Sequence, residues 1–283
     1  MIKTKDMLKT PSDAAVAGCL SLLLEVSGNP KAGNVDREHD FDDLKFEHFL
    51  ASAAGAFPAF LEVAEKRIIG EGVLRAVKES MRWHRAENVH FGAFLLLVPL
   101  ISSWDAGGMV DIAEAARNRL RRTDFRDSLS VLEAFRLSNA RVVEAGELNL
   151  KDRKTEEEIA QKKINLYEWM KMAPEENLIA RELVDGFKIS IEGAKFLLSF
   201  GNSGKAVVEL YYHLLSKFPD PLVIAKMGRE YAEKITEWAE KARTEEERKE
   251  LDEKLLKDGA NPGTIADLTA SSIFLALAEG WRI

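Results

Sequence analysis

The segment TPSDAAVAGCLSLLLEV, residues 10–26, indicates the fold class most directly. Thr10 is a suitable N-cap, Pro11 suits a first helical turn, and apolar residues then recur from Ala14 to Val26. This pattern predicts a strongly apolar helix.

Helical spacing continues along the rest of the chain. Apolar residues from Phe46 to Phe57 recur three and four positions apart. Further helices are predicted, more loosely, over 129–142 and then over 159–172, 178–200, 205–217, 224–242 and 262–278, with a charged helix over 244–257. No stretch alternates strictly, and Asp185-Gly186 lies inside a helical pattern. We therefore predict an all-α fold, a single-domain multi-helix bundle of about ten helices over residues 1–283 with a central polar pocket.

Composition narrows the class of protein. With 283 residues, 46% of them hydrophobic, the chain can bury a sizeable core. A net charge of -7, with acids and bases interspersed, predicts no general affinity for nucleic acid or anionic lipid. The single cysteine, Cys19, fits a reducing compartment. No signal peptide is visible, and the most apolar stretch, residues 91–101, is too short to cross a bilayer, so we expect a cytoplasmic protein.

One segment, residues 27–45, interrupts the helical pattern. It reads SGNPKAGNVDREHDFDDLK and separates two apolar helices, and long loops of this kind are often functional. Its carboxylates can hold Mg²⁺, which in turn binds phosphate oxygens, and Lys31 or Arg37 can contact phosphate directly. The alternative is a solvated acidic loop.

Two further polar groups lie beside predicted helices. Residues 88–92, NVHFG, precede an apolar run, so their side chains can point into a central pocket, and Gly92 permits close approach of a ligand or helix. His90 by itself is more often structural. Asn177 and Arg181 are four residues apart and share a helix face, where an arginine can clamp phosphate or lie on the surface.

The fourth group is NPGTIADL, residues 261–268. Asn261 can cap a helix, Pro262 suits its first turn, and a helix N-terminus offers free amide groups to an anion. Asp267 lies on an otherwise apolar helix, so its carboxylate needs a cation, an amide or a metal as partner.

Several other catalytic patterns are absent from the sequence. Residues 201–205, GNSGK, have glycines too closely spaced for a phosphate loop, and no strand is predicted before them. The sequence has no paired-cysteine zinc motif, no two-histidine helix motif and no Gly-x-Ser-x-Gly elbow.

The four groups, in this order, resemble the triphosphoribosyl-dephospho-coenzyme A synthase family, known from the citrate lyase and malonate decarboxylase systems. That family shows Glu-Val-Ser, Pro-Lys-x-Gly and Val-Asp-Arg where this chain has residues 25–27, 30–33 and 35–37. Its Asn-x-His/Asn-x-Gly motif matches Asn88, His90 and Gly92, and its Asn-Pro-Gly-x-x-Ala-Asp-Leu motif matches residues 261–268. The resemblance spans residues 11–280.

This chain departs from the family pattern at three places. Glu175 stands where the acid before Asn177 is often shorter. Residues 139–143, NARVV, replace a Pro-Gly-Gly stretch that many archaeal relatives carry, and Ala86-Glu87 replaces small residues. These departures concern the substrate rather than the fold.

The resemblance implies a transferase that moves the 5-triphosphoribosyl group of ATP onto a ribose hydroxyl of dephospho-coenzyme A and releases adenine. Such a glycosyl transfer passes through an oxocarbenium-like transition state, which needs nearby negative charge, and departing adenine benefits from protonation. By resemblance, Glu25, Asp36 and Asp267 are the catalytic acids, and Asp36 and Asp267 hold Mg²⁺; the division of roles among the three stays open. The implied nucleotide-binding residues are Lys31, Arg37, Asn88, His90, Gly92, Asn177, Arg181, Asn261 and Gly263.

Two alternatives stay open. The same ATP-ribosyl chemistry could act on another acceptor, or the chain could be a helical nucleotide-binding protein that has lost catalysis, which the altered residues 139–143 would permit. The expected partners are ATP and dephospho-coenzyme A, without nucleic acid or membrane, and the chain could form a homodimer.

Overall fold

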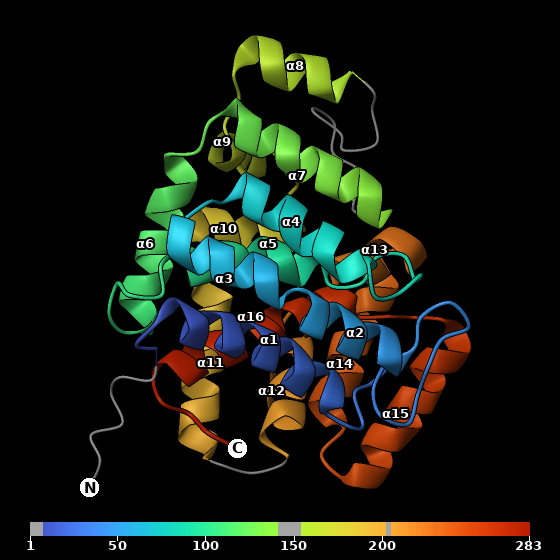
Figure 1. Cartoon of the computed structure of the whole chain (residues 1–283). Helices are drawn as coiled ribbons and strands as arrows, with labels where there is room; N and C mark the ends of the chain where they lie inside the picture. Colours follow the sequence, from blue (N-terminus) through green and yellow to red (C-terminus); the bar gives the residue numbers. More distant parts are fainter. Residues whose placement is uncertain (1–7, 141–153, 202–204) are drawn as a thin grey trace, which may run out of the picture.

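The computed structural model describes residues 8–140, 154–201 and 205–283, and the elements in these residues are helices with no strand among them (Figure 1). The prediction of an all-α fold is confirmed. The helices are α1 (Pro11–Ser27), α2 (Phe46–Gly55), α3 (Phe57–Lys66), α4 (Gly70–Met81), α5 (Phe91–Ser102), α6 (Met109–Arg121), α7 (Phe125–Ser138), α8 (Thr155–Lys162), α9 (Leu166–Lys171), α10 (Leu178–Asp185), α11 (Lys188–Phe200), α12 (Ala206–Leu215), α13 (Pro221–Met227), α14 (Arg229–Lys241), α15 (Glu245–Asp258) and α16 (Gly263–Ala278).

Helix α1 begins as its sequence predicts. The hydroxyl of Thr10 accepts a hydrogen bond from the backbone N–H of Asp13 (3.1 Å), and the Asp13 carboxylate accepts one from the Thr10 N–H (2.9 Å). This reciprocal cap satisfies two amide groups that the first turn would otherwise leave free, and Pro11 needs no donor there.

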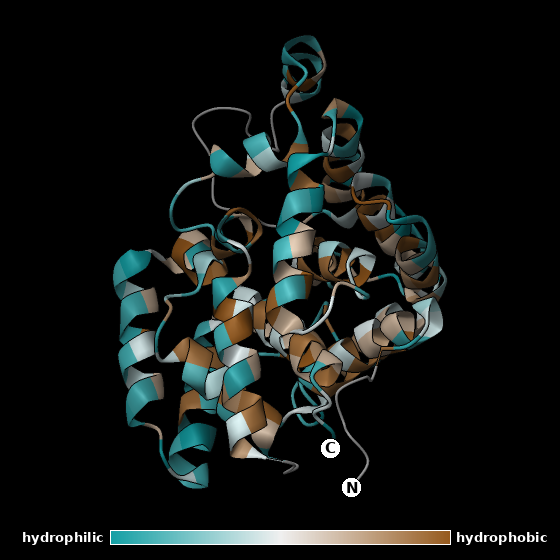
Figure 2. Ribbon diagram, turned by 90° about the vertical axis from the view of Figure 1, so that its left-hand side faces the viewer, coloured by the Kyte–Doolittle hydropathy of each residue, from teal (hydrophilic) through white to brown (hydrophobic). Residues whose placement is uncertain are grey.

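The core is built around α16 and α5. Helix α16 packs against α1, α5, α11 and α12, and side chains such as Ile273 and Phe274 are fully buried. Helix α5 is buried along almost its whole length, including Leu96 and Leu100. Hydrophobic residues accordingly concentrate toward the middle of the molecule (Figure 2). Because both helices are enclosed by others, their polar side chains must find partners inside the protein.

Three helices that periodicity predicts as continuous are broken in the structure. The predicted helix 159–172 is divided at Lys163, 178–200 at Gly186 and Phe187, and 224–242 at Gly228, and each of these residues has a positive φ. A left-handed residue ends a helix within one position without disturbing the apolar spacing on either side, so periodicity does not detect it. The predictions of continuous helices, and of about ten helices in all, were therefore wrong.

Some predicted features lie outside the described residues. These are Arg141, Val142 and Val143 of the stretch that replaces Pro-Gly-Gly, and residues 202–204 of the GNSGK segment.

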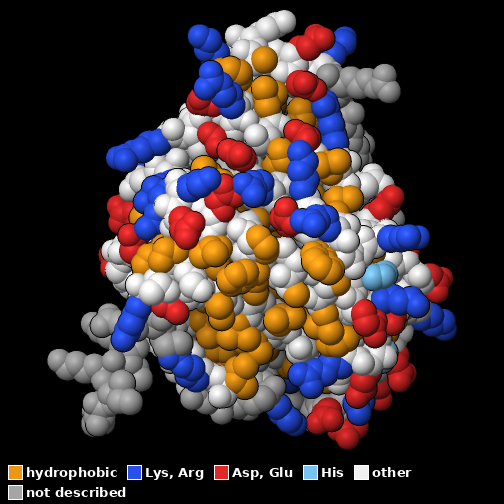
Figure 3. Space-filling model, viewed as in Figure 1, with side chains coloured by type: hydrophobic (Ala, Val, Ile, Leu, Met, Phe, Trp, Pro, Cys, Tyr) orange, Lys and Arg blue, Asp and Glu red, His pale blue; other side chains and the backbone are white. Residues whose placement is uncertain are grey.

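Within the described part of the chain, none of the helices combines the length and apolar character that crossing a membrane requires. Hydrophobic side chains nevertheless reach the surface, and on the face seen in Figure 3 they gather where α1 lies. Val16, on the outer side of α1, is 50% exposed.

The central position of α16 leads to a stability prediction. Phe274→Ala leaves a cavity in the middle of the core, and we expect the free energy of unfolding to fall by about 3–5 kcal/mol. Urea unfolding followed by circular dichroism measures this change. Val110→Ala is the control, because Val110 is 52% exposed and its loss should change the free energy of unfolding by less than about 0.5 kcal/mol. Equal effects of the two substitutions would contradict the proposed position of the core.

Candidate functional site

Polar residues from the four sequence groups line one pocket, whose walls come mainly from α5, α10, α16 and the segments just before these helices. The polar side chains that line it are Glu25, Asn34, Asn88, His90, Asn177, Asn261, Thr264 and Asp267. Gly92 and Gly263 also belong to the lining. Among the described residues that form its walls there is no lysine or arginine, so the pocket presents carboxylates and amides without a cation of its own.

Asp267 joins α16 to the beginning of α5. Its carboxylate accepts a hydrogen bond from the backbone N–H of Ala93 and keeps part of its surface open to the pocket. A Cβ atom at Gly92 would lie 2.1 Å from Oδ2 of Asp267. The close approach of this carboxylate explains the glycine. Of the two possibilities that the sequence allowed, a ligand or a neighbouring helix, the structure shows the helix α16.

The environment of Asp267 favours its protonated form. Burial raises the pKa of this carboxyl well above its usual value, and the negative charges of Glu25 and Asp220 raise it further. The hydrogen bond from Ala93 opposes the shift in part. Asp267 is consequently a stronger base than an ordinary aspartate.

Glu25 faces the pocket from α1 and forms a buried ion pair with Lys31. Lys31 has no exposed surface, and its ammonium lies 5.8 Å from the centre of the Tyr211 ring. Burial raises the pKa of the Glu25 carboxyl, and the charge of Lys31 lowers it in part. Lys31 thus lies behind Glu25 rather than in the lining, with its positive charge paired inside the protein.

Asp220 is an organising residue that the sequence reasoning missed. It caps α13 by accepting a hydrogen bond from the N–H of Leu222 (2.7 Å), and its other oxygen accepts one from Ile265 at the start of α16 (2.9 Å). Burial raises the pKa of Asp220 to about 6. The expectation that α16 offers free amides to an anion is wrong for Ile265, because the N–H of Ile265 already donates to the carboxylate of Asp220. Asp followed by Pro221 before an apolar run was the available capping signal.

The segment before α5 has an unusual backbone. Asn88 (φ 50°) and His90 (φ 63°) both adopt the left-handed conformation, which costs free energy for residues other than glycine. The N–H of Asn88 donates to the carbonyl of Ser138 (2.6 Å), which anchors the segment to the end of α7. This conformation places both side chains on the pocket wall.

His90 is held as a neutral imidazole. Burial lowers its pKa to about 3, with smaller effects from His84 and Lys31. Its Nδ1 lies 2.9 Å from the hydroxyl of Ser52, which accepts a hydrogen bond from Ser80 (2.6 Å). The hydrogen of the Ser52 hydroxyl is then free for Nδ1, so we expect the ring proton on Nε2, which is buried and has no hydrogen-bond partner in the part of the chain that the structure describes. Serines within helical apolar spacing give no sequence signal for such a role.

The loop that follows α1 is anchored by helices from the far end of the chain. The N–H of Gly33 donates to Asp252 of α15 (2.8 Å), and the hydroxyl of Tyr211 donates to the carbonyl of Ala32 (2.9 Å). The side chain of Asn34 donates to the carbonyl of Pro262 (3.3 Å), which brings Asn34 to the pocket. Gly33 has φ +70°, and a Cβ there would lie 2.5 Å from the Ala260 carbonyl oxygen.

Asp36 lies in this loop but not in the pocket lining. It is fully buried, and its two oxygens accept hydrogen bonds from the backbone N–H groups of Lys31 (3.1 Å), Glu38 (2.9 Å) and His39 (3.1 Å). The structure therefore places the two predicted magnesium ligands differently, with Asp267 in the pocket and Asp36 inside the loop. The alternative of a fully solvated acidic loop does not describe this part of the segment.

The two arginines expected near phosphate are exposed. Arg37 lies on the surface of the loop, and the side chain of Arg181 is 48% exposed and 3.7 Å from Asp185. Asn177, in contrast, lines the pocket and caps α10 by accepting a hydrogen bond from Ala180 (3.0 Å). Neither arginine belongs to the lining, and their roles in nucleotide binding stay predictions.

Asn261 contributes a buried amide oxygen to the pocket. Its Oδ1 is buried and has no hydrogen-bond partner among the described residues. An amide oxygen left in this way costs free energy unless a ligand, water or cation satisfies it. Together with the carboxylate of Asp267, it gives the pocket a set of oxygen donors, which is the type of ligand that Mg²⁺ prefers.

Comparison with known proteins finds both a family and a similar solved structure. The family model described as ATP:dephospho-CoA triphosphoribosyl transferase matches residues 11–283. A crystal structure from Archaeoglobus fulgidus, assigned as a triphosphoribosyl-dephospho-CoA synthase, is similar at 95% sequence identity, with 84% of this chain and 100% of that chain covered and a TM-score of 0.77. None of the curated proteins matches the chain.

The burial of His90 leads to a spectroscopic prediction. In ¹⁵N NMR spectra recorded from pH 8 to about 4.5, its ring should stay neutral with the proton on Nε2, whereas an unfolded histidine titrates near 6.5. Because the folded pKa lies below the unfolded one, His90 should lower the free energy of unfolding as the pH falls from about 6.5 toward 3.

Ser52→Ala is the control for the tautomer. It removes the partner of Nδ1 while the ring stays buried, so we expect the proton to redistribute between the two nitrogens without a large rise in the pKa. An imidazolium spectrum for His90 at about pH 5.5 would contradict the assignment.

Proposed function

The chain belongs to the ATP:dephospho-CoA triphosphoribosyl transferase family, and from this premise we propose that the pocket around Asp267 is its active site. The enzyme transfers the 5-triphosphoribosyl group of ATP to a ribose hydroxyl of dephospho-coenzyme A and releases adenine. One observation supports this location above all: residues from all four sequence groups line the same pocket, namely Asn34, Asn88, His90, Gly92, Asn177, Asn261, Gly263 and Asp267, together with Glu25.

The reaction exchanges one bond at C1 of the ATP ribose for another. The bond from C1 to adenine breaks, a bond from C1 to the acceptor oxygen forms, the acceptor hydroxyl loses a proton and adenine gains one. We assign Asp267 as the group that takes the hydroxyl proton. Its raised pKa makes it a strong base for a carboxylate, and its side chain lines the pocket, where it can reach the acceptor.

Glu25 is suited to a different role. Its pairing with Lys31 favours the ionised form, and its carboxylate faces the pocket. Fixed negative charge of this kind stabilises the positive charge that develops on the ribose in the transition state. Asp36 then acts indirectly. Its carboxylate accepts a hydrogen bond from the backbone N–H of Lys31 and so holds Lys31, the partner of Glu25, in place.

The neutral polar residues are suited to recognise the nucleotide. The Nε2–H of His90 can donate to a ring nitrogen of adenine, and as a neutral group it does so without bringing positive charge next to the developing cation on the ribose. The amides of Asn88, Asn177 and Asn261 offer both donors and acceptors to purine and ribose. Their positions at the ends of rigid helices fix these groups before the substrate arrives.

Magnesium fits this pocket as the counter-charge of the triphosphate. The lining has no lysine or arginine among the described residues, while Asp267 and the unpartnered Oδ1 of Asn261 are oxygen donors. We propose that Oδ1 of Asn261 would hold Mg²⁺ beside the triphosphate, which leaves the carboxylate of Asp267 to act as the base. When bound, the ion supplies positive charge that neutralises the triphosphate and positions it.

The role of Asp267 is tested by Asp267→Asn. The amide keeps the shape that fits against Gly92 but cannot take up a proton, so adenine release should fall about 100-fold or more. The Tm should change little, because the packing is retained. In the unsubstituted enzyme, kcat/KM should fall on acidification at a pH above the pKa of an ordinary aspartate. Asp42→Asn, in the exposed part of the loop, is the matched control and should keep full activity. If Asp267→Asn kept more than a tenth of the activity, Asp267 would not be the group that takes the hydroxyl proton.

The magnesium proposal is tested by calorimetry of ATP binding. We expect at least a 10-fold lower affinity in the presence of EDTA than with Mg²⁺, because an uncompensated triphosphate would meet the carboxylates of Glu25 and Asp267. Adenosine is the control: it has no phosphate groups, so its affinity should be the same in both conditions. Equal affinity for ATP with and without Mg²⁺ would rule out a metal-bridged site.

A further inference from the structure

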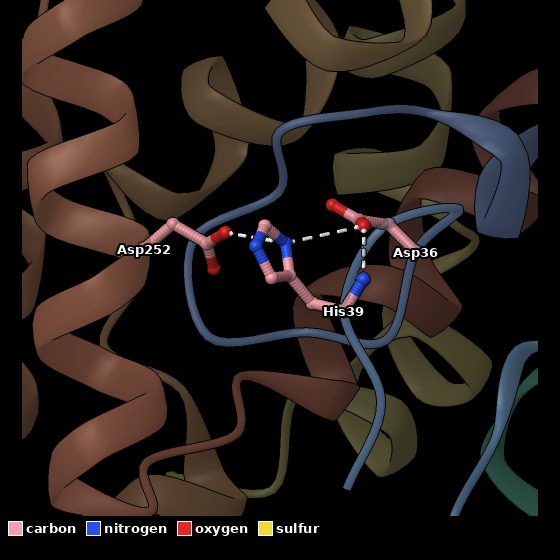
Figure 4. A group of neighbouring side chains, drawn as sticks. All are labelled: Asp36, His39 and Asp252. Atoms are coloured by element: carbon pink, nitrogen blue, oxygen red, sulfur yellow. Dashed lines mark hydrogen bonds and ion pairs between the residues drawn. The ribbon is translucent and has the colours of Figure 1, made fainter.

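A second cluster of ligating side chains lies outside the active-site pocket, where the loop after α1 meets α15. The imidazole of His39 lies between the carboxylates of Asp36 and Asp252 (Figure 4). Its Nδ1 is 2.9 Å from Oδ2 of Asp252 and 3.4 Å from Oδ1 of Asp36. The ligating atoms of all three side chains lie within 4.8 Å of one another.

Two atoms of this cluster are buried and form no hydrogen bond with any residue that the structure describes. Nδ1 of His39 and Oδ2 of Asp252 face each other at 2.9 Å, but the contact does not have the alignment of a hydrogen bond. Asp252 is only 1% exposed, so bulk solvent does not reach this oxygen. A buried carboxylate oxygen and a ring nitrogen left in this way are costly unless a third group satisfies both.

The spacing of the ligating atoms suits a bound ion. Ligands held at ~2.1 Å from one ion are roughly 3.0–3.4 Å apart in octahedral or tetrahedral geometry. The distances of 2.9 and 3.4 Å in the cluster are close to this range.

The surrounding backbone fixes the orientation of both carboxylates. The second oxygen of Asp252 accepts the hydrogen bond from Gly33, and Asp36 accepts those from Lys31, Glu38 and His39. Partners of this kind orient metal ligands and are typical of the shell behind a metal site.

We propose that Asp36, His39 and Asp252 form a binding site for a first-row divalent transition metal ion such as Zn²⁺ or Mn²⁺. One imidazole nitrogen and two carboxylate oxygens favour these ions over Mg²⁺, which prefers oxygen ligands alone. The ring of His39 is 30% exposed, so water can accept its Nε2–H while Nδ1 binds the ion.

The ion fastens the loop to α15. The same loop carries Lys31, which pairs with Glu25, and Asn34, which lines the pocket. The site is therefore structural, and it is separate from the magnesium that accompanies ATP.

The test uses the full chain, stripped of metal by a chelator and dialysed, in the absence of ATP and dephospho-coenzyme A. Zn²⁺, Mn²⁺ and Mg²⁺ are each titrated by calorimetry and by the change in Tm. We expect one ion of Zn²⁺ or Mn²⁺ per chain, at least 10-fold weaker binding of Mg²⁺, and a rise in Tm of about 5 °C when the ion is present at 100 times its Kd.

Two substitutions locate the ion. Asp252→Asn keeps an acceptor for Gly33, and His39→Gln changes a partly exposed side chain, and each should weaken binding at least 10-fold and remove the rise in Tm. Asp43→Asn, an exposed acid of the same loop, and Asp267→Asn, in the pocket, should bind the ion like the unsubstituted chain. Should one of the two site variants fail to fold, the other still decides the question.

Two outcomes would overturn the proposal. No saturable binding of Zn²⁺ or Mn²⁺, with an unchanged Tm, would mean that His39 bridges the two carboxylates without a metal. Binding that persists in Asp252→Asn and His39→Gln but disappears in Asp267→Asn would place the ion in the active-site pocket instead.

Discussion

The site depends on one buried carboxylate, that of Asp267, held between two apolar helices. It connects α16 to the first turn of α5 over Gly92, where a side chain would collide with it. Both helices are enclosed by the rest of the bundle, so neither can move away to relieve a misfit. Packing of the core thus fixes the position of the proposed proton acceptor. In this way a helical bundle can hold a reactive group as accurately as catalysis requires.

The charges around the pocket are arranged to suit a cationic transition state. Glu25 and Asp267 line the pocket, the charge of Asp220 is close enough to raise the pKa of Asp267, and the cation beside Glu25, Lys31, is already paired. Asp220 is neutralised in part by helix amides, and burial raises the pKa values of all three acids. An anionic substrate therefore meets an unfavourable environment until it brings its own counter-ion, while a ribose that becomes positive meets a favourable one.

Much of the fold and part of the site could be predicted from the sequence. Apolar spacing identified many of the helices, although not α4 or α6, and the motif residues Glu25, Asn88, His90, Gly92, Asn177, Asn261, Gly263 and Asp267 do meet in one pocket. Spacing did not reveal single left-handed residues such as Phe187, because they change direction without changing the pattern. Nor could it reveal that Asp220 contacts Ile265 or that Asp252 contacts Gly33, because these partners are distant in sequence. Contacts between distant segments likewise decide which side chains of a loop are buried. Asp36 is fully buried, whereas the next residue, Arg37, is exposed.

The anchoring of the loop after α1 has a consequence for how the protein is made. Its hydrogen bonds reach 179 residues ahead to Tyr211, 219 to Asp252 and 228 to Pro262. During synthesis the ribosome releases this loop long before any of those partners exists. The first segment of the active site to emerge therefore waits for the last helices to be translated, and a chain that stops before α15 and α16 has no means of forming the site, however well its earlier helices fold.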